Sequence, residues 1–241
     1  MTVAGSLDLD PDPTVGEPIL DNPAWASLTG PHRRFGERHG LAARYLPEVA
    51  PFVALLDPDD PQAWRDAAVL VGAGGSFAVA GTRIEPPAGW TTTAAGAGVQ
   101  MVDVAVEKEP DPEAVRLGPG DVPAILDLVA RTQPGPFQER TVELGTYLGI
   151  RRGGALVAMA GERLHPEGWT EISAVCTDPA FRRQGLAGRL VSAVAAGIAD
   201  RGEQAFLHAS AANVTAIRLY AAMGFRLRLV TQFHAITAPD G

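Results

Sequence analysis

The residues with the clearest chemical meaning form a basic turn, Arg182-Arg183-Gln184-Gly185-Leu186-Ala187-Gly188-Arg189, between a strand pattern and a long helical pattern. The start of a helix carries unpaired N–H groups and a partial positive charge, and both favour phosphate binding. Gly185 leaves room for a pyrophosphate at the backbone, and Ala187 and Gly188 keep the next turn small. The turn therefore predicts a phosphate site, and an ordinary strand-to-helix connection with a solvated basic surface is the alternative.

The spacing of this turn differs from two common nucleotide-binding loops. A dinucleotide fold places Gly-x-Gly-x-x-Gly after its first strand, and a Walker A loop needs Gly-Lys-Ser or Gly-Lys-Thr. Neither pattern is present. Arg182, Gly185 and Ala187 instead fit the pattern Arg or Gln, two residues, Gly, one residue, then Gly or Ala, after the stretch Val175-Cys176-Thr177-Asp178-Pro179.

With this motif and its order of elements, the segment 115–236 resembles the GCN5-related N-acetyltransferase superfamily, in details closest to its FR47-like branch. The resemblance covers about half of the chain. It implies an α/β fold with a mixed, mostly antiparallel sheet, splayed in its middle and flanked by helices. It also implies that acetyl-CoA is the co-substrate, without a metal. The groups it assigns to the CoA pyrophosphate are Arg182, Arg183, Gln184, Gly185, Leu186, Ala187 and Gly188.

The strand before the turn is expected from the resemblance to bulge and to bind the pantetheine arm through its backbone. By position, the residues are Val175, Cys176 and Thr177, and one of their amides would polarise the acetyl carbonyl. Plain strand core is the alternative for Val175. Cys176 could be read as a nucleophile, but no obvious His or Asn partner accompanies it in this region of the sequence, and a free cysteine usually behaves as a small buried hydrophobe.

Acetyl transfer to an amine needs a base for the ammonium proton and an acid for the departing thiolate. Glu171, eleven residues before Arg182, matches the offset of the catalytic glutamate in the histone-acetyltransferase branch. Apolar neighbours on its strand predict a raised pKa, which suits a base. A solvent-facing glutamate at a strand edge is the alternative. Glu162 is the reserve candidate, followed by Glu143 and His165.

The pattern Asn213-x-x-Ala216-x-x-Leu219-Tyr220-x-x-x-Gly224-Phe225 resembles the family's last helix. The resemblance assigns Tyr220 to the CoA sulfur as general acid, and Asn213 to the pantetheine arm. Asn213 is also a good N-cap, a role that can coexist with the first. Tyr220 could instead be a half-buried aromatic side chain.

Periodicity and capping signals place the elements of the second half. A glycine pair, Gly153-Gly154, predicts a hairpin, and Asp121 is the expected N-cap of a helix. The expected strands are 115–117, 146–151, 155–164, 169–177, 204–209 and 225–236. The expected helices are 122–131, 184–201 and 214–223.

The first half carries no motif for chemistry. Residues 1–20 have the composition of a flexible acidic tail. An α/β region over 21–107, with strands at 52–56, 77–80 and 99–106 and a helix at 61–71, could be a degenerate copy of the catalytic domain at 115–236. The stretch 86–98 is rich in Gly, Pro and Thr and predicts a loop.

Composition limits the partners. A formal net charge of −8 argues against nucleic acid, which needs clustered positive charge. No signal peptide or membrane span is recognisable, and a single cysteine fits a reducing cytoplasm. We therefore expect a cytoplasmic N-acetyltransferase with a small-molecule or peptide amine as acceptor, and a homodimer is possible. A non-catalytic acyl-CoA-binding regulatory module, a longer acyl donor and an alcohol acceptor are the alternatives.

Overall fold

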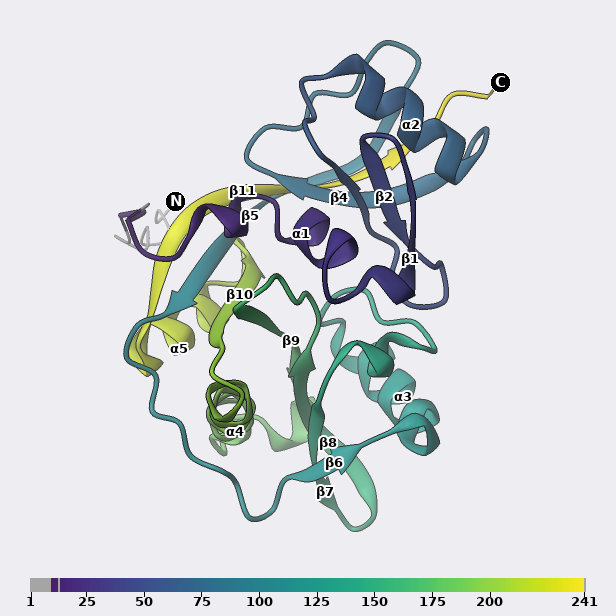
Figure 1. Cartoon of the computed structure of the whole chain (residues 1–241). Helices are drawn as coiled ribbons and strands as arrows, with labels where there is room; N and C mark the ends of the chain where they lie inside the picture. Colours follow the sequence, from purple (N-terminus) through teal and green to yellow (C-terminus); the bar gives the residue numbers. More distant parts are fainter. Residues whose placement is uncertain (1–9, 13, 241) are drawn as a thin grey trace, which may run out of the picture.

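The computed structural model describes residues 10–12 and 14–240 and has a mixed α/β fold (Figure 1). Most strands belong to one large sheet with the order β4-β11-β5-β10-β9-β8-β7-β6. Among the strands of this sheet that the structure describes, only the neighbours β9 and β10 run parallel, so the sheet is mostly antiparallel. The strands are β4 (Ser76–Gly81), β5 (Thr91–Asp103), β6 (Val115–Leu117), β7 (Tyr147–Arg152), β8 (Ala155–Glu162), β9 (Trp169–Thr177), β10 (Gln204–Ser210) and β11 (Phe225–Thr237).

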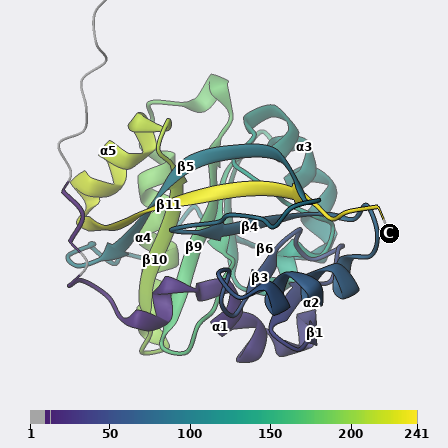
Figure 2. The same ribbon diagram turned by 90° about the horizontal axis from the view of Figure 1, so that it is seen from above.

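The helices and a small second sheet cover the large sheet (Figure 2). The small sheet has the order β1-β2-β3 and lies with α1 and α2 in the upper part of Figure 1. Its strands are β1 (Gly36–His39), β2 (Ala42–Tyr45) and β3 (Val53–Leu55). The helices are α1 (Pro23–Thr29), α2 (Pro61–Val71), α3 (Val122–Thr132), α4 (Leu186–Asp200) and α5 (Val214–Met223).

The second half follows the sequence prediction closely. Gly153 and Gly154, with φ of 56° and 85°, form the predicted turn between β7 and β8. The helix α4 begins at Leu186 rather than at residue 184, because Arg183 and Gly185 adopt left-handed backbone conformations with φ of 63° and 74°. Asp121 stands at the N-cap of α3, but its carboxylate accepts from the Gly118 N–H instead of capping that helix.

The large sheet is splayed where β9 and β10 separate. The two strands pair only as far as Ile172 and Leu207. Immediately beyond, β9 bulges against β8, and Ala174 has a φ of 53°. A bulge re-aims a strand and interrupts its ladder. Beyond Ile172, the described part of the chain gives β9 no strand partner on the β10 side, so backbone groups there are open to a ligand.

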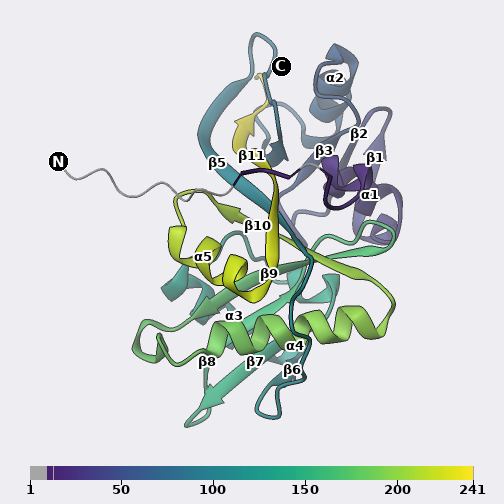
Figure 3. The ribbon, with the colours of Figure 1, turned by 90° about the vertical axis from the view of Figure 1, so that its left-hand side faces the viewer.

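The stretch 91–98 is not a loop as predicted but the first part of β5. Its Thr, Ala and Gly residues are mostly exposed, so no apolar alternation marks the strand in the sequence. Pairing with β11 holds it in place. The strand β5 lies between β10 and β11, and β11 continues to pair with β4, so the long strands tie both halves into one sheet (Figure 3).

Two apolar clusters pack on opposite faces of the sheet around the splay. One joins α4 and α5 to the sheet and includes Leu190, Val194 and Tyr220. The other joins the first half to the sheet through Leu20, Tyr45, Trp169 and Phe206. Leu20 is fully buried, although the composition of 1–20 predicted a flexible tail; residues 1–9 and 13 of that prediction lie outside the described residues.

Within residues 10–12 and 14–240, no helix combines the length and the apolar character that a bilayer crossing requires.

Candidate active site

The turn between β9 and α4 has the geometry of an anion site. Its N–H groups, from Arg183 to Gly188, donate no hydrogen bond within the described residues. A side chain built at Gly185 would meet nothing within 4 Å, so the space above the helix start is open. Unpaired amides at a helix start favour a phosphate. The residues therefore fit the pyrophosphate that the sequence assigned to them.

Two of the three arginines of this turn supply positive charge that no carboxylate of the described residues neutralises. Arg182 and Arg183 are exposed and form no ion pair with the described part of the chain. Arg189 differs, because Asp111 at 2.6 Å and Glu113 at 2.7 Å neutralise it. Arg182 and Arg183 are thus the cations available to a phosphate.

The candidate pantetheine strand places its three residues differently. Val175 packs against the cluster under α4, and Cys176 is buried on the side of α3. Burial raises the pKa of the Cys176 thiol to about 11, which opposes a nucleophilic role. The Thr177 Oγ1 is buried and has no hydrogen-bond partner in the described residues, an unusual state that a ligand group could relieve.

Tyr220 lies on α5, beside the splay, and Asn213 directly precedes that helix. The Asn213 side chain accepts from the Ala216 N–H at 3.1 Å, so the predicted N-cap is confirmed. Tyr220 is only 6% exposed. Burial, with a smaller contribution from Cys176, raises its pKa to about 12. The hydroxyl therefore keeps its proton at neutral pH, as a general acid must.

Glu171 is fully buried on β9, with four donors around its carboxylate. Arg163 binds both oxygens, through Nε at 2.8 Å and Nη2 at 2.6 Å. The Leu164 N–H at 3.2 Å and the His208 Nδ1 at 2.7 Å complete the set. Burial alone would raise the pKa of Glu171, but the charge and hydrogen bonds of Arg163, with those of His208, hold it well below its usual range. The predicted raised pKa is therefore wrong.

The weaker carboxylate and histidine candidates are held in other contacts. Glu162 accepts from the Thr146 N–H and pairs with Arg201 at 3.0 Å. The Glu143 carboxylate pairs with a surface arginine, and the His165 Nε2 lies 2.8 Å from Glu203. None of the three lines the cavity described next.

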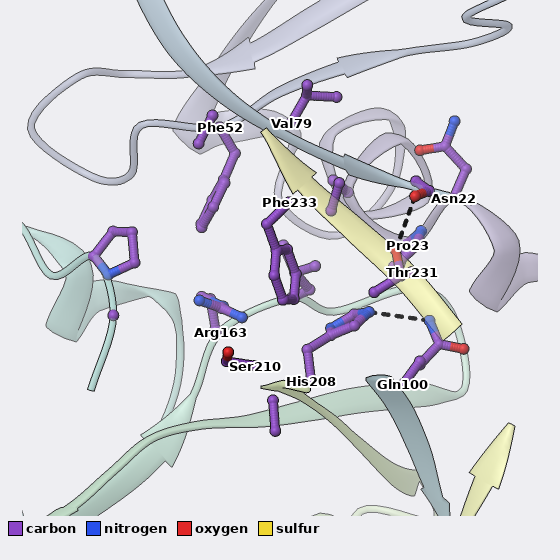
Figure 4. A pocket seen from close by; sticks show the side chains of 18 of the residues that line it. Asn22, Pro23, Phe52, Val79, Gln100, Arg163, His208, Ser210, Thr231 and Phe233 are labelled. Atoms are coloured by element: carbon purple, nitrogen blue, oxygen red, sulfur yellow. Dashed lines mark hydrogen bonds between the residues drawn. The ribbon is translucent and has the colours of Figure 1, made fainter. Parts of the chain in front are cut away.

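A cavity of about 380 Å³ lies between the first half and the splayed sheet (Figure 4). Its walls are largely apolar, with Phe52, Val79 and Phe233 among them. Arg163 and His208 bring polar groups into this wall. Sequence reasoning missed His208; the available signal was a histidine two residues after Phe206, on the same face of an otherwise apolar strand.

Within the described residues, no three His, Cys, Asp or Glu side chains gather in a way that could hold an ion.

Comparisons with known proteins agree with this geometry. The FR47-like protein family matches residues 147–234. A crystal structure of a GNAT-family protein from Novosphingobium aromaticivorans is 36% identical, with a TM-score of 0.84, over 93% of this chain and all of the other. A GCN5-related N-acetyltransferase from Kribbella flavida shares the fold at 18% identity, with a TM-score of 0.57, over 91% and 96% of the two chains. A search of curated proteins found no match. The chain belongs to the GCN5-related N-acetyltransferase family, in its FR47-like branch.

Proposed function

We propose that this protein transfers an acetyl group from acetyl-CoA to an amine, directly and within a ternary complex. The observation that carries the proposal is the turn 183–188, whose amides are unpaired at the start of α4 beside two exposed arginines. The opened edge of β9 continues from this turn toward the splay and offers backbone groups to the pantetheine arm. The family membership supports the same chemistry.

The acceptor would enter from the opposite side, through the cavity. Its largely apolar walls and its volume of about 380 Å³ favour a small amine with an apolar body over a peptide. Acetyl-CoA supplies an activated acyl carbon and a thiolate leaving group. Tyr220, protonated at neutral pH, gives its proton to that sulfur as the C–S bond breaks.

Calorimetric titration with acetyl-CoA tests the cofactor part of this proposal. Gly185→Glu places bulk and negative charge at the pyrophosphate, so we expect binding to be lost. Gly202→Glu is the matched control, because it adds the same charge just beyond the other end of the same helix, also at a positive φ and into open space. Equal acetyl-CoA affinity in the parent and in Gly185→Glu would exclude this site.

Release of free CoA thiol, measured with a panel of amines starting with 2-phenylethylamine, tests the chemistry. In Tyr220→Phe we expect kcat to fall about 100-fold or more while acetyl-CoA affinity is kept. Tyr147→Phe is the control, because the Tyr147 hydroxyl is buried without a partner in the described residues. Binding without turnover on any amine would instead indicate a regulatory acyl-CoA-binding module.

A further inference from the structure

The hydrogen bonds around Gln100 on β5 fix the orientation of its amide. Arg228 on β11 donates to the Gln100 Oε1 at 3.0 Å, and an arginine can only donate. The Gln100 Nε2 therefore faces away, with one N–H on the Leu20 carbonyl at 2.8 Å. Its other N–H points at the His208 Nε2, 3.2 Å away (Figure 4).

These contacts determine the tautomer of His208 from both sides of its ring. Glu171 is a carboxylate and can only accept, so the His208 Nδ1 carries the proton between them. Gln100 presents an N–H, so the His208 Nε2 presents a lone pair. Charged groups lie on two sides of the ring. Glu171 from β9 contacts it directly with Arg163 behind, and Arg228 with Asp21 lies behind Gln100 on the other side.

Glu171 itself has no lone pair to offer. A carboxylate has about four acceptor positions, and Arg163, Leu164 and His208 fill four with two hydrogen bonds on each oxygen. Along this network, the next group able to take a proton is the His208 Nε2, and His208 lines the cavity. Its contact with Gln100, at 3.2 Å, is the longest link between side chains in the network, and it is the contact that an entering ammonium group would have to displace.

We propose that His208 is the general base for the acceptor amine and that Glu171 is a positioning residue that fixes its tautomer. The proposal rests on the proposed function. The His208 Nε2 takes one proton from the acceptor ammonium and becomes an imidazolium next to the Glu171 carboxylate. The amine nitrogen then bonds to the thioester carbonyl carbon as the C–S bond breaks. Tyr220 protonates the sulfur, and the second proton lost from the nitrogen restores the tyrosine hydroxyl.

The tautomer is measured on the unchanged protein. In long-range ¹H–¹⁵N spectra of histidine-labelled protein at neutral pH, we expect His208 to be protonated at Nδ1 and bare at Nε2. Its signals are those absent from His208→Asn or His208→Gln. Glu171→Gln presents an amide in place of the carboxylate, so we expect the His208 tautomer to change there. A proton on Nε2 in the parent would overturn the proposal whatever the activity.

The base role is measured with acetyl-CoA and 2-phenylethylamine, or the best amine of the panel. His208→Asn keeps an N–H for Glu171 but removes the Nε2 lone pair. We expect kcat/KM to fall about 100-fold or more and the acid limb of its pH profile to disappear, with acetyl-CoA affinity unchanged. Parent-like kcat/KM and pH profile in His208→Asn would overturn this inference and leave the proposed function intact. A parent that fails to bind acetyl-CoA would overturn both.

Discussion

The buried charge of Glu171 needs a partner because it has been removed from water. Arg163, 15% exposed at its side chain, supplies two of the four hydrogen bonds and the opposing charge. An unpaired carboxylate in such a place is strongly destabilising, whereas a paired one is tolerated. Arg163 is therefore needed for the stability of the fold, because it is the charged partner of the buried Glu171 carboxylate.

We expect Arg163→Met to lower the free energy of unfolding at pH 7 by about 3–5 kcal/mol, because it leaves Glu171 charged and unpaired. Urea unfolding measures this. Arg140→Met is the control, since Arg140 pairs with Glu143 on the surface and such pairs contribute about 1 kcal/mol or less. Equal losses in the two variants would contradict the argument.

The pH dependence of this difference has a definite sign. In the folded parent the pKa of Glu171 is lower than in the unfolded chain. The ionised carboxylate therefore adds its full contribution to the free energy of unfolding above the unfolded-state pKa. That contribution is lost as the pH falls through the folded-state pKa. In Arg163→Met, burial is no longer opposed by the arginine, so the carboxyl can fold in its neutral form. We therefore expect the difference in the free energy of unfolding between parent and variant to narrow as the pH falls from 7, beginning above the usual glutamate pKa of about 4.3.

Local spacing was enough to nominate some of the candidate site. The sequence could indicate the turn from Arg182 to Gly188, and Tyr220 with Asn213, because each group lies within one strand-to-helix or helix segment. The environment of Glu171 could not be found in this way. Arg163 and His208 approach it only once separate strands pair, so a sequence that places Glu171 among apolar neighbours predicts the opposite pKa direction.

At the scale of elements, the bulge in β9 decides where the sheet opens. Ala174 holds a φ of 53°, a conformation that β-branched residues rarely adopt. We expect Ala174→Val to destabilise the protein by roughly 1–3 kcal/mol and to weaken acetyl-CoA binding, because the strain falls on the splayed strand. Ala174→Gly should stay within about 1 kcal/mol of the parent. Urea unfolding and calorimetry measure both effects, and equal stability of the two variants would refute this account of the bulge.

Elements with an internal period were predictable, and β5 shows why others were not. The helix α2 and the strand β9 carry their own apolar pattern or caps, and their bounds agree with the sequence prediction. Residues 91–97 are exposed Thr, Ala and Gly residues, and their strand exists because β11, more than 120 residues later, pairs with them. The pairing with β11, and not the local sequence of residues 91–98, makes this segment a strand.

At the scale of the whole molecule, the two halves repeat several features. In the first half, Phe52, directly before β3, forms a parallel bridge with Ala78 on β4. In the second half, β9 and β10 pair in parallel in the same way. The turns after β3 and β9 both begin with Asp-Pro, and Asp57 and Asp178 each accept from the N–H two residues on at 2.9 Å. That the first half is a degenerate copy stays a prediction, and these correspondences support it.

The counterpart turn lacks what a pyrophosphate needs, so we expect one acetyl-CoA per chain. Between β3 and α2 it reads Asp57-Pro58-Asp59-Asp60, without a glycine and with three carboxylates that repel phosphate. The Asp60 side chain already accepts from the Gln62 N–H at the start of α2. Calorimetry should give a stoichiometry of one, reduced to none by Gly185→Glu. Two sites, one of which survives that substitution, would mean that the first half still binds acetyl-CoA. The argument that the acidic turn repels the pyrophosphate would then be wrong.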